Sequence, residues 1–175
     1  MQRKSARTVA EIVDNIRRVF QVVNEQSKKV ERETGVTGPQ LWAMKVIAEN
    51  APIKGAEIAR RMYLHPTTVV GILDRLEARG LITKTRSVVD RRVVDVDLTE
   101  QGRNLLANAP EVAQGALVRG LEGIEEERLL RIADGLEQLV HLLGVEEIPP
   151  KLILSAEVNL PKKQAGEKPA AKKRR

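Results

Sequence analysis

In the middle of this 175-residue chain the spacing of apolar residues changes from a helical period to alternation, and that change limits the folds the chain can adopt. Through residues 55–79 apolar side chains recur at helical spacing, which predicts two short amphipathic helices joined by a tight turn. In "LITKTR" and "VVDVDL", which follow, they alternate with polar ones, which predicts two strands of a hairpin with a loop at residues 87–92. A helix-turn-helix followed by a β-hairpin is a winged helix, so the pattern predicts that fold.

Two helices are predicted before the helix-turn-helix. The first is amphipathic and extends to about Glu33, where "ETG" brings a glycine that favours a helix end. The second begins in "VTGP", since proline suits a first helical turn, and "APIK" breaks it. We expect its apolar face to consist of Leu41, Met44, Ile47 and Ala48.

Two further helices are predicted after the hairpin. Thr99 is expected to cap the first, whose apolar residues continue past a kink at Pro110. Gly120 and Gly123 then make a turn before a last helix at about residues 124–143. That helix has more apolar surface than one small domain can cover. We therefore expect the first and last helices to form a dimerisation region.

The distribution of charge points to a polyanionic partner. The net charge is +6, and residues 151–175 carry all of it, because residues 1–150 hold 22 basic and 22 acidic residues. Within that neutral part, residues 53–92 have a net charge of +5 and residues 93–150 of −8. A basic middle, an acidic later third and a basic tail suit a protein that turns one face toward nucleic acid.

Composition excludes several kinds of site. The chain has no cysteine, so disulfides, thiolate metal sites and cysteine redox sensing are excluded, and two histidines alone cannot form a histidine-rich metal site. We find no nucleophile–base arrangement and no phosphate-binding glycine loop, and we expect no enzyme, no cofactor and no metal. No apolar run approaches a membrane span, and the N-terminus lacks a signal-peptide region, so we expect a cytoplasmic protein that does not bind a membrane.

Four segments in register resemble the MarR (multiple-antibiotic-resistance regulator) family of bacterial transcription factors. They are the helix around Gln40, "EIARRMYLHPTTVVGILDRLEARGLI", "DRR" and "LTEQG". The resemblance is close over about residues 36–106 and rests on length and placement over 5–33 and 107–144. It implies a mainly α fold with a small β-hairpin wing. It also implies a homodimer on double-stranded DNA, with one recognition helix per subunit in the major groove and one wing along the minor groove.

The resemblance further implies a small-molecule effector, often a phenolic or aromatic acid, which binds between the dimer region and the winged helix and weakens DNA binding.

We expect the chain to have five parts. They are an N-terminal dimerisation helix (5–35), a winged helix-turn-helix DNA-binding domain (36–98), C-terminal dimerisation helices (99–144), an extension arm (145–160) and a basic, disordered tail (161–175).

The wing loop carries Asp90, Arg91 and Arg92. The negative potential of the minor groove, strongest where A·T tracts narrow it, attracts an inserted guanidinium, and a hairpin tip is thin enough to reach it. By the family pattern Arg92 is inserted, Asp90 holds the loop and Arg91 lies nearer phosphate. The alternative is a solvated Asp–Arg turn pair, which contributes little on its own. The flanking "GLITK" and "LTEQG" favour the wing interpretation.

On the predicted recognition helix, Thr67, Thr68 and Gly71 lie on the face turned away from the core. The two threonines can bind base edges or phosphates, and they can equally cap the helix. Many relatives carry a polar residue and an arginine where this chain has Val70 and Gly71. We therefore expect limited base readout by this helix, with more of the specificity coming from the wing and from DNA shape.

Several basic residues are candidates for phosphate contacts. Arg75 matches the family's phosphate contact, and no acidic residue lies three or four positions away to form an ion pair along the helix. Lys54, Arg60, Arg61 and Arg86 are secondary candidates, for which simple solvation is the alternative.

Three residues are candidates for effector contacts. Trp42 lies one step off its apolar face and either borders the cleft beside the dimer region or packs at the helix edge. Arg17 either holds a carboxylate or is solvated, and His65 either marks the start of the recognition helix or senses protons.

The leading hypothesis is a homodimeric, sequence-specific transcriptional regulator, more often a repressor in such a family. The alternative is an architectural DNA-binding protein of low sequence specificity, assisted by its basic tail. The ratio of operator affinity to random-duplex affinity distinguishes them.

Overall fold

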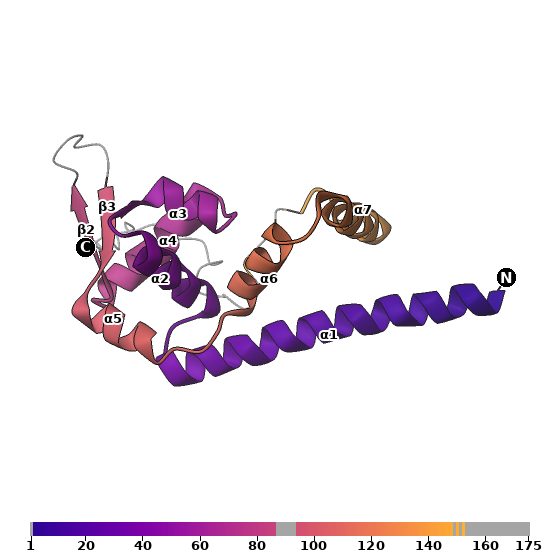
Figure 1. Cartoon of the computed structure of the whole chain (residues 1–175), viewed down its shortest axis with the longest axis horizontal. Coiled ribbons are helices and arrows are strands. Elements are labelled where there is room, and N and C mark those ends of the chain that lie inside the picture. The colour runs from indigo at the N-terminus through magenta and orange to yellow at the C-terminus, as the bar shows by residue number, and fades with distance from the viewer. Residues whose placement is uncertain (1, 87–93, 149, 151, 153–175) are drawn as a thin grey trace, which may run out of the picture.

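The structure is a computed structural model that describes residues 2–86, 94–148, 150 and 152. A long first helix extends from a small body that contains the sheet (Figure 1). The last helix lies apart from that body, on the side of the N-terminal end of the first helix. The helices are α1 (Gln2–Thr34), α2 (Gly38–Asn50), α3 (Gly55–Arg61), α4 (Pro66–Ala78), α5 (Glu100–Ala107), α6 (Ala113–Glu122) and α7 (Glu126–Leu143). The strands are β1 (Ile53–Lys54), β2 (Ile82–Arg86) and β3 (Val94–Leu98).

The predicted ends of α1 and α5 are confirmed by their backbone geometry. Gly35 follows α1 with a φ of 68°, a left-handed conformation that glycine adopts without a steric penalty. Thr99 caps α5, since its hydroxyl accepts a hydrogen bond from the backbone N–H of Gly102 at 3.0 Å. A Cβ at Gly102 would lie 2.1 Å from the carbonyl oxygen of Leu81, so this glycine lets α5 pack directly against the start of β2.

The core of the body forms around α2. Its members include Leu41, Met44 and Ile47 from α2, together with Ile72 and Leu76 from α4, all almost inaccessible to solvent. The prediction that Ala48 belongs to this core is wrong. Most of the first half of α2 is buried on every side, so its helical period does not define a single inward face.

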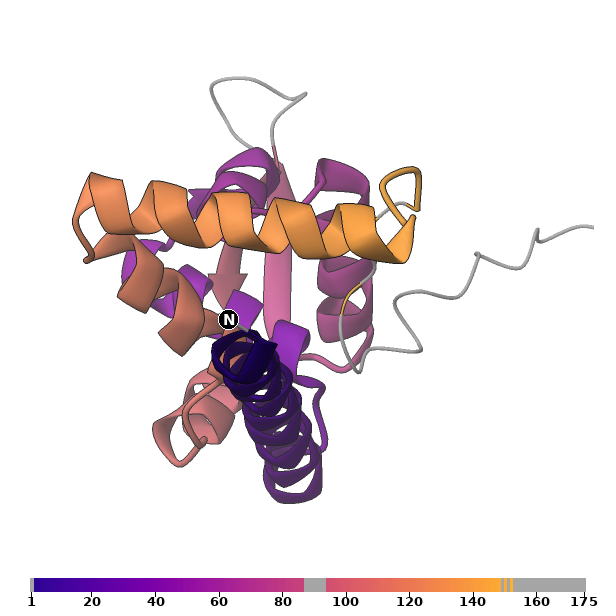
Figure 2. The same cartoon turned by 90° about the vertical axis from the view of Figure 1, so that its right-hand side faces the viewer.

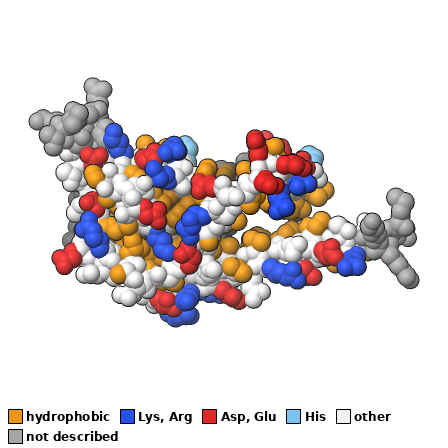
Figure 3. Space-filling model, viewed as in Figure 1, with side chains coloured by type: hydrophobic (Ala, Val, Ile, Leu, Met, Phe, Trp, Pro, Cys, Tyr) orange, Lys and Arg blue, Asp and Glu red, His pale blue; other side chains and the backbone are white. Residues whose placement is uncertain are grey.

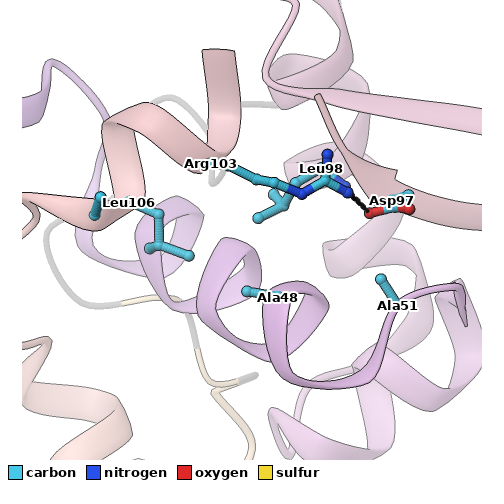
Figure 4. Close-up of a pocket in the computed structure, with 7 residues that line it drawn as sticks. Ala48, Ala51, Asp97, Leu98, Arg103 and Leu106 are labelled. Atoms are coloured by element: carbon cyan, nitrogen blue, oxygen red, sulfur yellow. Dashed lines mark hydrogen bonds and ion pairs between the residues drawn. The ribbon is translucent and has the colours of Figure 1, made fainter. Parts of the chain in front are cut away.

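Ala48 instead lines an open groove of about 450 Å³ between the end of α2, β3 and α5. Figure 4 shows Ala48 and Ala51 on one side of this groove, with Leu98 and Leu106 across from them. The side chains of Arg103 and Asp97 form an ion pair at 2.7 Å beside it.

The sheet has three strands, in the order β1–β3–β2, where the sequence predicted a two-stranded hairpin. The "APIK" segment was expected only to break a helix, but Ile53 pairs with Val96 and Lys54 with Asp95 in antiparallel register. A strand of two residues cannot display alternation, so the periodicity of the sequence gave no signal for it. Its consequence is that β3 is hydrogen-bonded on both sides.

The prediction of one helix kinked at Pro110 is also wrong. Residues 108–112 are not helical, and they separate α5 from α6. Proline has no N–H to donate and restricts the residue before it, so this segment ends one helix and redirects the chain. Gly120, expected in a turn, lies inside α6, and only Gly123 lies at its end.

The helices α1 and α7 leave apolar faces uncovered. In Figure 3 hydrophobic side chains follow the side of α1 that faces α7, and Figure 2 shows α7 crossing in front of the body. No residue of α7 is buried in this chain. The large exposed apolar residues of the two helices are Val9, Ile12, Val13, Val19, Phe20, Val22, Leu129, Leu130, Ile132, Leu136, Val140, Leu142 and Leu143. Among the described residues no helix is long and apolar enough to cross a bilayer.

Candidate nucleic-acid interface

The second helix of the helix-turn-helix, α4, exposes its first turn. Val69, Ile72, Leu73 and Leu76 are buried and hold it against the core, while Pro66, Thr67 and Val70 are exposed. His65 is the N-cap, and its Nδ1 lies 2.8 Å from the hydroxyl of Thr67 and 3.4 Å from the backbone N–H of Thr67, which donates to it. The cap is therefore the side chain of His65 and not Thr67, whose exposed position leaves the predicted base or phosphate contact open.

The middle of the exposed face of α4 is small and apolar. Thr68 and Gly71 are half-buried, Val70 is 50% exposed, and a Cβ at Gly71 would meet no atom within 4 Å. This face can approach a groove closely, but it offers few hydrogen-bond donors for base edges. The expectation of limited base readout by α4 stays a prediction with this geometry behind it.

The wing is built on β2 and β3, whose last described pair is Arg86 with Val94. Asp90, Arg91 and Arg92, the predicted minor-groove residues, lie outside the described residues. Arg86 is exposed at the point where β2 ends, and Lys54 is exposed at the start of α3. Both stay candidates for phosphate contacts, as does Arg75, which is half-buried on α4.

Lys84 connects the wing to the recognition helix, and sequence reasoning missed it. Its Nζ lies 2.7 Å from Oδ1 of Asp74 and 3.0 Å from Oε2 of Glu77, both on α4. Burial lowers the pKa of Lys84, but hydrogen bonds and Coulombic attraction from the two carboxylates outweigh it, so the pKa lies above its ordinary value. This lysine is occupied in holding β2 against α4. The three-residue spacing of Asp74 and Glu77 on a helix predicted to lie beside the strand was the available signal.

Arg60 and Arg61 are both directed at an acidic residue of their own helix. Arg60 lies 2.5 Å and Arg61 2.7 Å from Oε1 of Glu57. The hydrogen bond from Arg60, followed by the interactions with Arg61, lowers the pKa of Glu57 to about 2. The phosphate role predicted for these arginines would require them to leave this carboxylate.

Trp42 borders a cleft between α2, α3 and α6 and is nevertheless 7% exposed, so both roles considered for it coexist. The cleft has a volume of about 220 Å³, and α6 comes so close that a Cβ at Gly115 would lie 3.3 Å from the indole. Its lining consists of Trp42, Val46, Glu49, Asn50, Arg60, Arg61, Tyr63, Gly115, Val118, Arg119 and Glu122.

The other two candidate effector residues do not line this cleft. Arg17 pairs with Asp14 on α1 at 3.0 Å, and His65 lies at the start of α4. Sequence reasoning missed Tyr63, Arg119 and Glu122, because nothing in the spacing brings α6 beside the turn after α3. Over the described part of the chain, no three His, Asp or Glu side chains are grouped to hold a metal ion.

Comparison with known proteins agrees with this geometry. Residues 36–94 match the model of the MarR family. The chain is 29% identical over 139 residues to the HTH-type transcriptional repressor MdtR of Bacillus subtilis, covering 79% of this chain and 90% of that protein. It also resembles the crystal structure of YusO from Bacillus subtilis, with a TM-score of 0.50 and 28% identity, over 78% of this chain and 96% of YusO.

A third relative was solved with a ligand. The structure of CouR from Rhodococcus jostii RHA1 bound to p-coumaroyl-CoA has a TM-score of 0.50 and 27% identity, and the match covers 81% of this chain and 95% of CouR.

Proposed function

This chain belongs to the MarR family of DNA-binding transcriptional regulators, and from that premise we propose that it is a homodimeric, sequence-specific repressor controlled by a small molecule. The observation that carries the proposal is the joint between α4 and the wing. Lys84 holds the strand to Asp74 and Glu77, so the exposed first turn of α4 and the wing are presented to DNA as one surface. The similarity to MdtR, which is named a repressor, supports repression rather than activation.

The DNA contacts in this proposal are of three kinds: to the major groove, to the minor groove and to phosphates. Thr67, Thr68 and Gly71 enter the major groove, and in the wing Arg92 enters the minor groove, Asp90 holds the loop and Arg91 lies nearer phosphate. Arg75, Arg86 and Lys54 neutralise phosphates. The basic tail at 161–175 adds a sequence-independent electrostatic contribution.

The dimer in this proposal is formed by residues 5–35 and 99–144. Its support is the apolar surface of α1 and α7, which one subunit leaves in water. Sedimentation of a Leu136→Glu variant tests it, because a charge on this face should dissociate the dimer. Leu142→Glu is the matched control, since Leu142 is exposed but lies outside the stripe that Leu129, Ile132, Leu136, Val140 and Leu143 form at three- and four-residue steps along α7. Equal dissociation of both variants, or of neither, would contradict the assignment of the interface.

The effector cleft in this proposal is the space beside Trp42. A ligand-bound relative, CouR, makes an organic acid derivative a reasonable class of effector. Trp42 is the only tryptophan, so its fluorescence reports ligand entry directly.

The decisive experiment compares DNA from immediately upstream of the gene with random duplex of equal length, at about 150 mM salt. We expect a preference of about a thousandfold or more, which collapses in Arg92→Ala. Comparable binding to both duplexes, insensitive to Arg92, would instead identify an architectural DNA-binding protein.

A further inference from the structure

The turn between α3 and α4 is bonded to α6 through one side chain. The hydroxyl of Tyr63 donates a hydrogen bond of 2.8 Å to Oε1 of Glu122, which is 59 residues further along the chain. Tyr63 lies two residues before His65, the N-cap of the recognition helix, and Glu122 is the last residue of α6. The bond therefore joins the helix-turn-helix to the helix that leads into α7.

Backbone hydrogen bonds hold the turn at Tyr63, and the hydrogen bond to Glu122 holds its side chain. Its side chain is 68% exposed, so little apolar contact holds the ring. Its φ of 51° is a left-handed conformation, which is uncommon for a non-glycine residue, and the turn is closed by backbone hydrogen bonds from Tyr63 N–H to Arg60 O at 3.1 Å and from Leu64 N–H to Ala59 O at 3.0 Å.

The bonded pair lies between two cavities. Tyr63, Val118 and Glu122 line the polar cleft beside Trp42, and the same three residues line a second cavity of about 300 Å³. Leu121 and Leu129 complete that second, apolar cavity. A molecule that fills either space lies beside the Tyr63–Glu122 pair.

The neighbouring charges leave Glu122 to the tyrosine. Arg60 in the same cleft is held by Glu57, and Arg119 donates to Glu111. Glu111 also accepts from Lys45 at 3.4 Å, so each of these two carboxylates is shared by two basic groups.

We propose that the Tyr63–Glu122 hydrogen bond is a tether that positions the recognition helix relative to α6, and that occupation of the adjoining cavities changes DNA binding by breaking it. This rests on the proposed function as a ligand-controlled DNA-binding protein. Tyr63 and Glu122 are positioning residues, since neither needs to touch DNA. Only Leu64 separates Tyr63 from His65, the N-cap of α4, so a displaced turn is transmitted directly to the helix that enters the groove.

Operator affinity in a set of variants tests the positioning role. Tyr63→Phe removes only the hydroxyl, and we expect it to weaken operator binding about fivefold, an effect of the size that one hydrogen bond supplies. Glu122→Leu should weaken binding equally, and the double variant should lose nothing more. Glu122→Gln keeps an acceptor oxygen and should restore most of the affinity. Losses that multiply in the double variant would overturn the tether.

Glu126→Leu is the matched control for charge. It removes one negative charge from the exposed start of α7, as Glu122→Leu does from the end of α6, without touching the tyrosine. If it weakened operator binding as much as Glu122→Leu, the effect would be electrostatic and the proposal would fail.

Filling the two cavities with a larger side chain tests whether their occupation changes operator binding through the Tyr63–Glu122 hydrogen bond. Val118→Phe, with Leu121→Phe as a second variant should the first unfold, should weaken operator binding in the parent protein and have no further effect on Tyr63→Phe. An equal loss in both backgrounds would show that the cavities act by another route.

The hydrogen bond itself can be tested without DNA. Tyr63 is the only tyrosine, so absorbance at 295 nm follows its ionisation alone. The hydrogen bond to Glu122 raises the pKa of Tyr63, and Glu122→Leu should return it to its ordinary value while Glu126→Leu should not. A raised pKa with no operator preference would refute the proposed function and leave the tether standing. An operator preference with an unshifted pKa would refute the tether alone.

Discussion

The substitution Lys84→Met tests whether Lys84 positions the DNA-binding surface or contacts DNA itself. Methionine keeps an unbranched apolar side chain and removes the charge that lies between Asp74 and Glu77. The lysine side chain is 19% exposed and each carboxylate 45%, so each pair should contribute near the upper end of the range of about 0.2–1 kcal/mol known for exposed ion pairs. The two carboxylates, three residues apart on one helix, are then left facing each other as like charges.

We therefore expect Lys84→Met to cost about 1–2 kcal/mol, which lowers the Tm of a chain of this length by roughly 2–8 °C. Operator affinity should fall because β2 is no longer held to α4. The slope of log affinity against log salt should stay unchanged, since Lys84 neutralises protein carboxylates and no phosphate. Thermal unfolding followed by circular dichroism and a salt series of fluorescence anisotropy measure the two quantities.

Arg86→Met is the matched control, because Arg86 lies two residues along the same strand and is exposed. It should leave the Tm unchanged and reduce the salt slope by about 0.9. The reasoning is refuted if Lys84→Met gives this second result, a shallower salt slope at an unchanged Tm.

The remaining predictions concern stability. Gly102→Ala should lower the Tm by several degrees, since its Cβ would meet a backbone carbonyl oxygen at 2.1 Å. Gly71→Ala should raise the Tm by about 2–4 °C, because Gly71 lies inside a helix and its Cβ would meet no atom within 4 Å. An equal response of the two variants would contradict this account of the two glycines. The pKa of Glu57, about 2 in the fold, lies below its unfolded value, so its interaction with Arg60 stabilises the protein above about pH 4.5 and is lost as the pH falls toward 2. In the Glu57→Gln variant, the free energy of unfolding should not show the decrease between about pH 4.5 and 2 that this interaction causes in the parent protein. Identical acid-unfolding curves for the two proteins would contradict a stabilising role of Glu57.

The helix-turn-helix could be predicted because its signals are local. Proline at the start of α4, glycine after it and apolar residues at helical spacing are all visible within a short window. Strand β1 could not be predicted, because its two residues, Ile53 and Lys54, are too few to show the alternation of apolar and polar residues. The inward face of α2 could not be chosen because that helix is buried around most of its first half.

The candidate site divides in the same way. Residues of one helix, such as Thr67 and Thr68, follow from the pattern that places the helix. The Tyr63–Glu122 bond joins residues 59 positions apart, and the packing of α6 against α2 decides whether they meet. No periodicity in one sequence encodes such a contact.

The central position of β3 bears on how proteins of this kind change their target DNA. Because β3 is hydrogen-bonded to β1 and to β2, both ends of the wing loop leave a fixed frame at the pair formed by Arg86 and Val94. If Asp90, Arg91 and Arg92 make the DNA contacts proposed above, substitutions among them would give a new binding preference on the same described sheet.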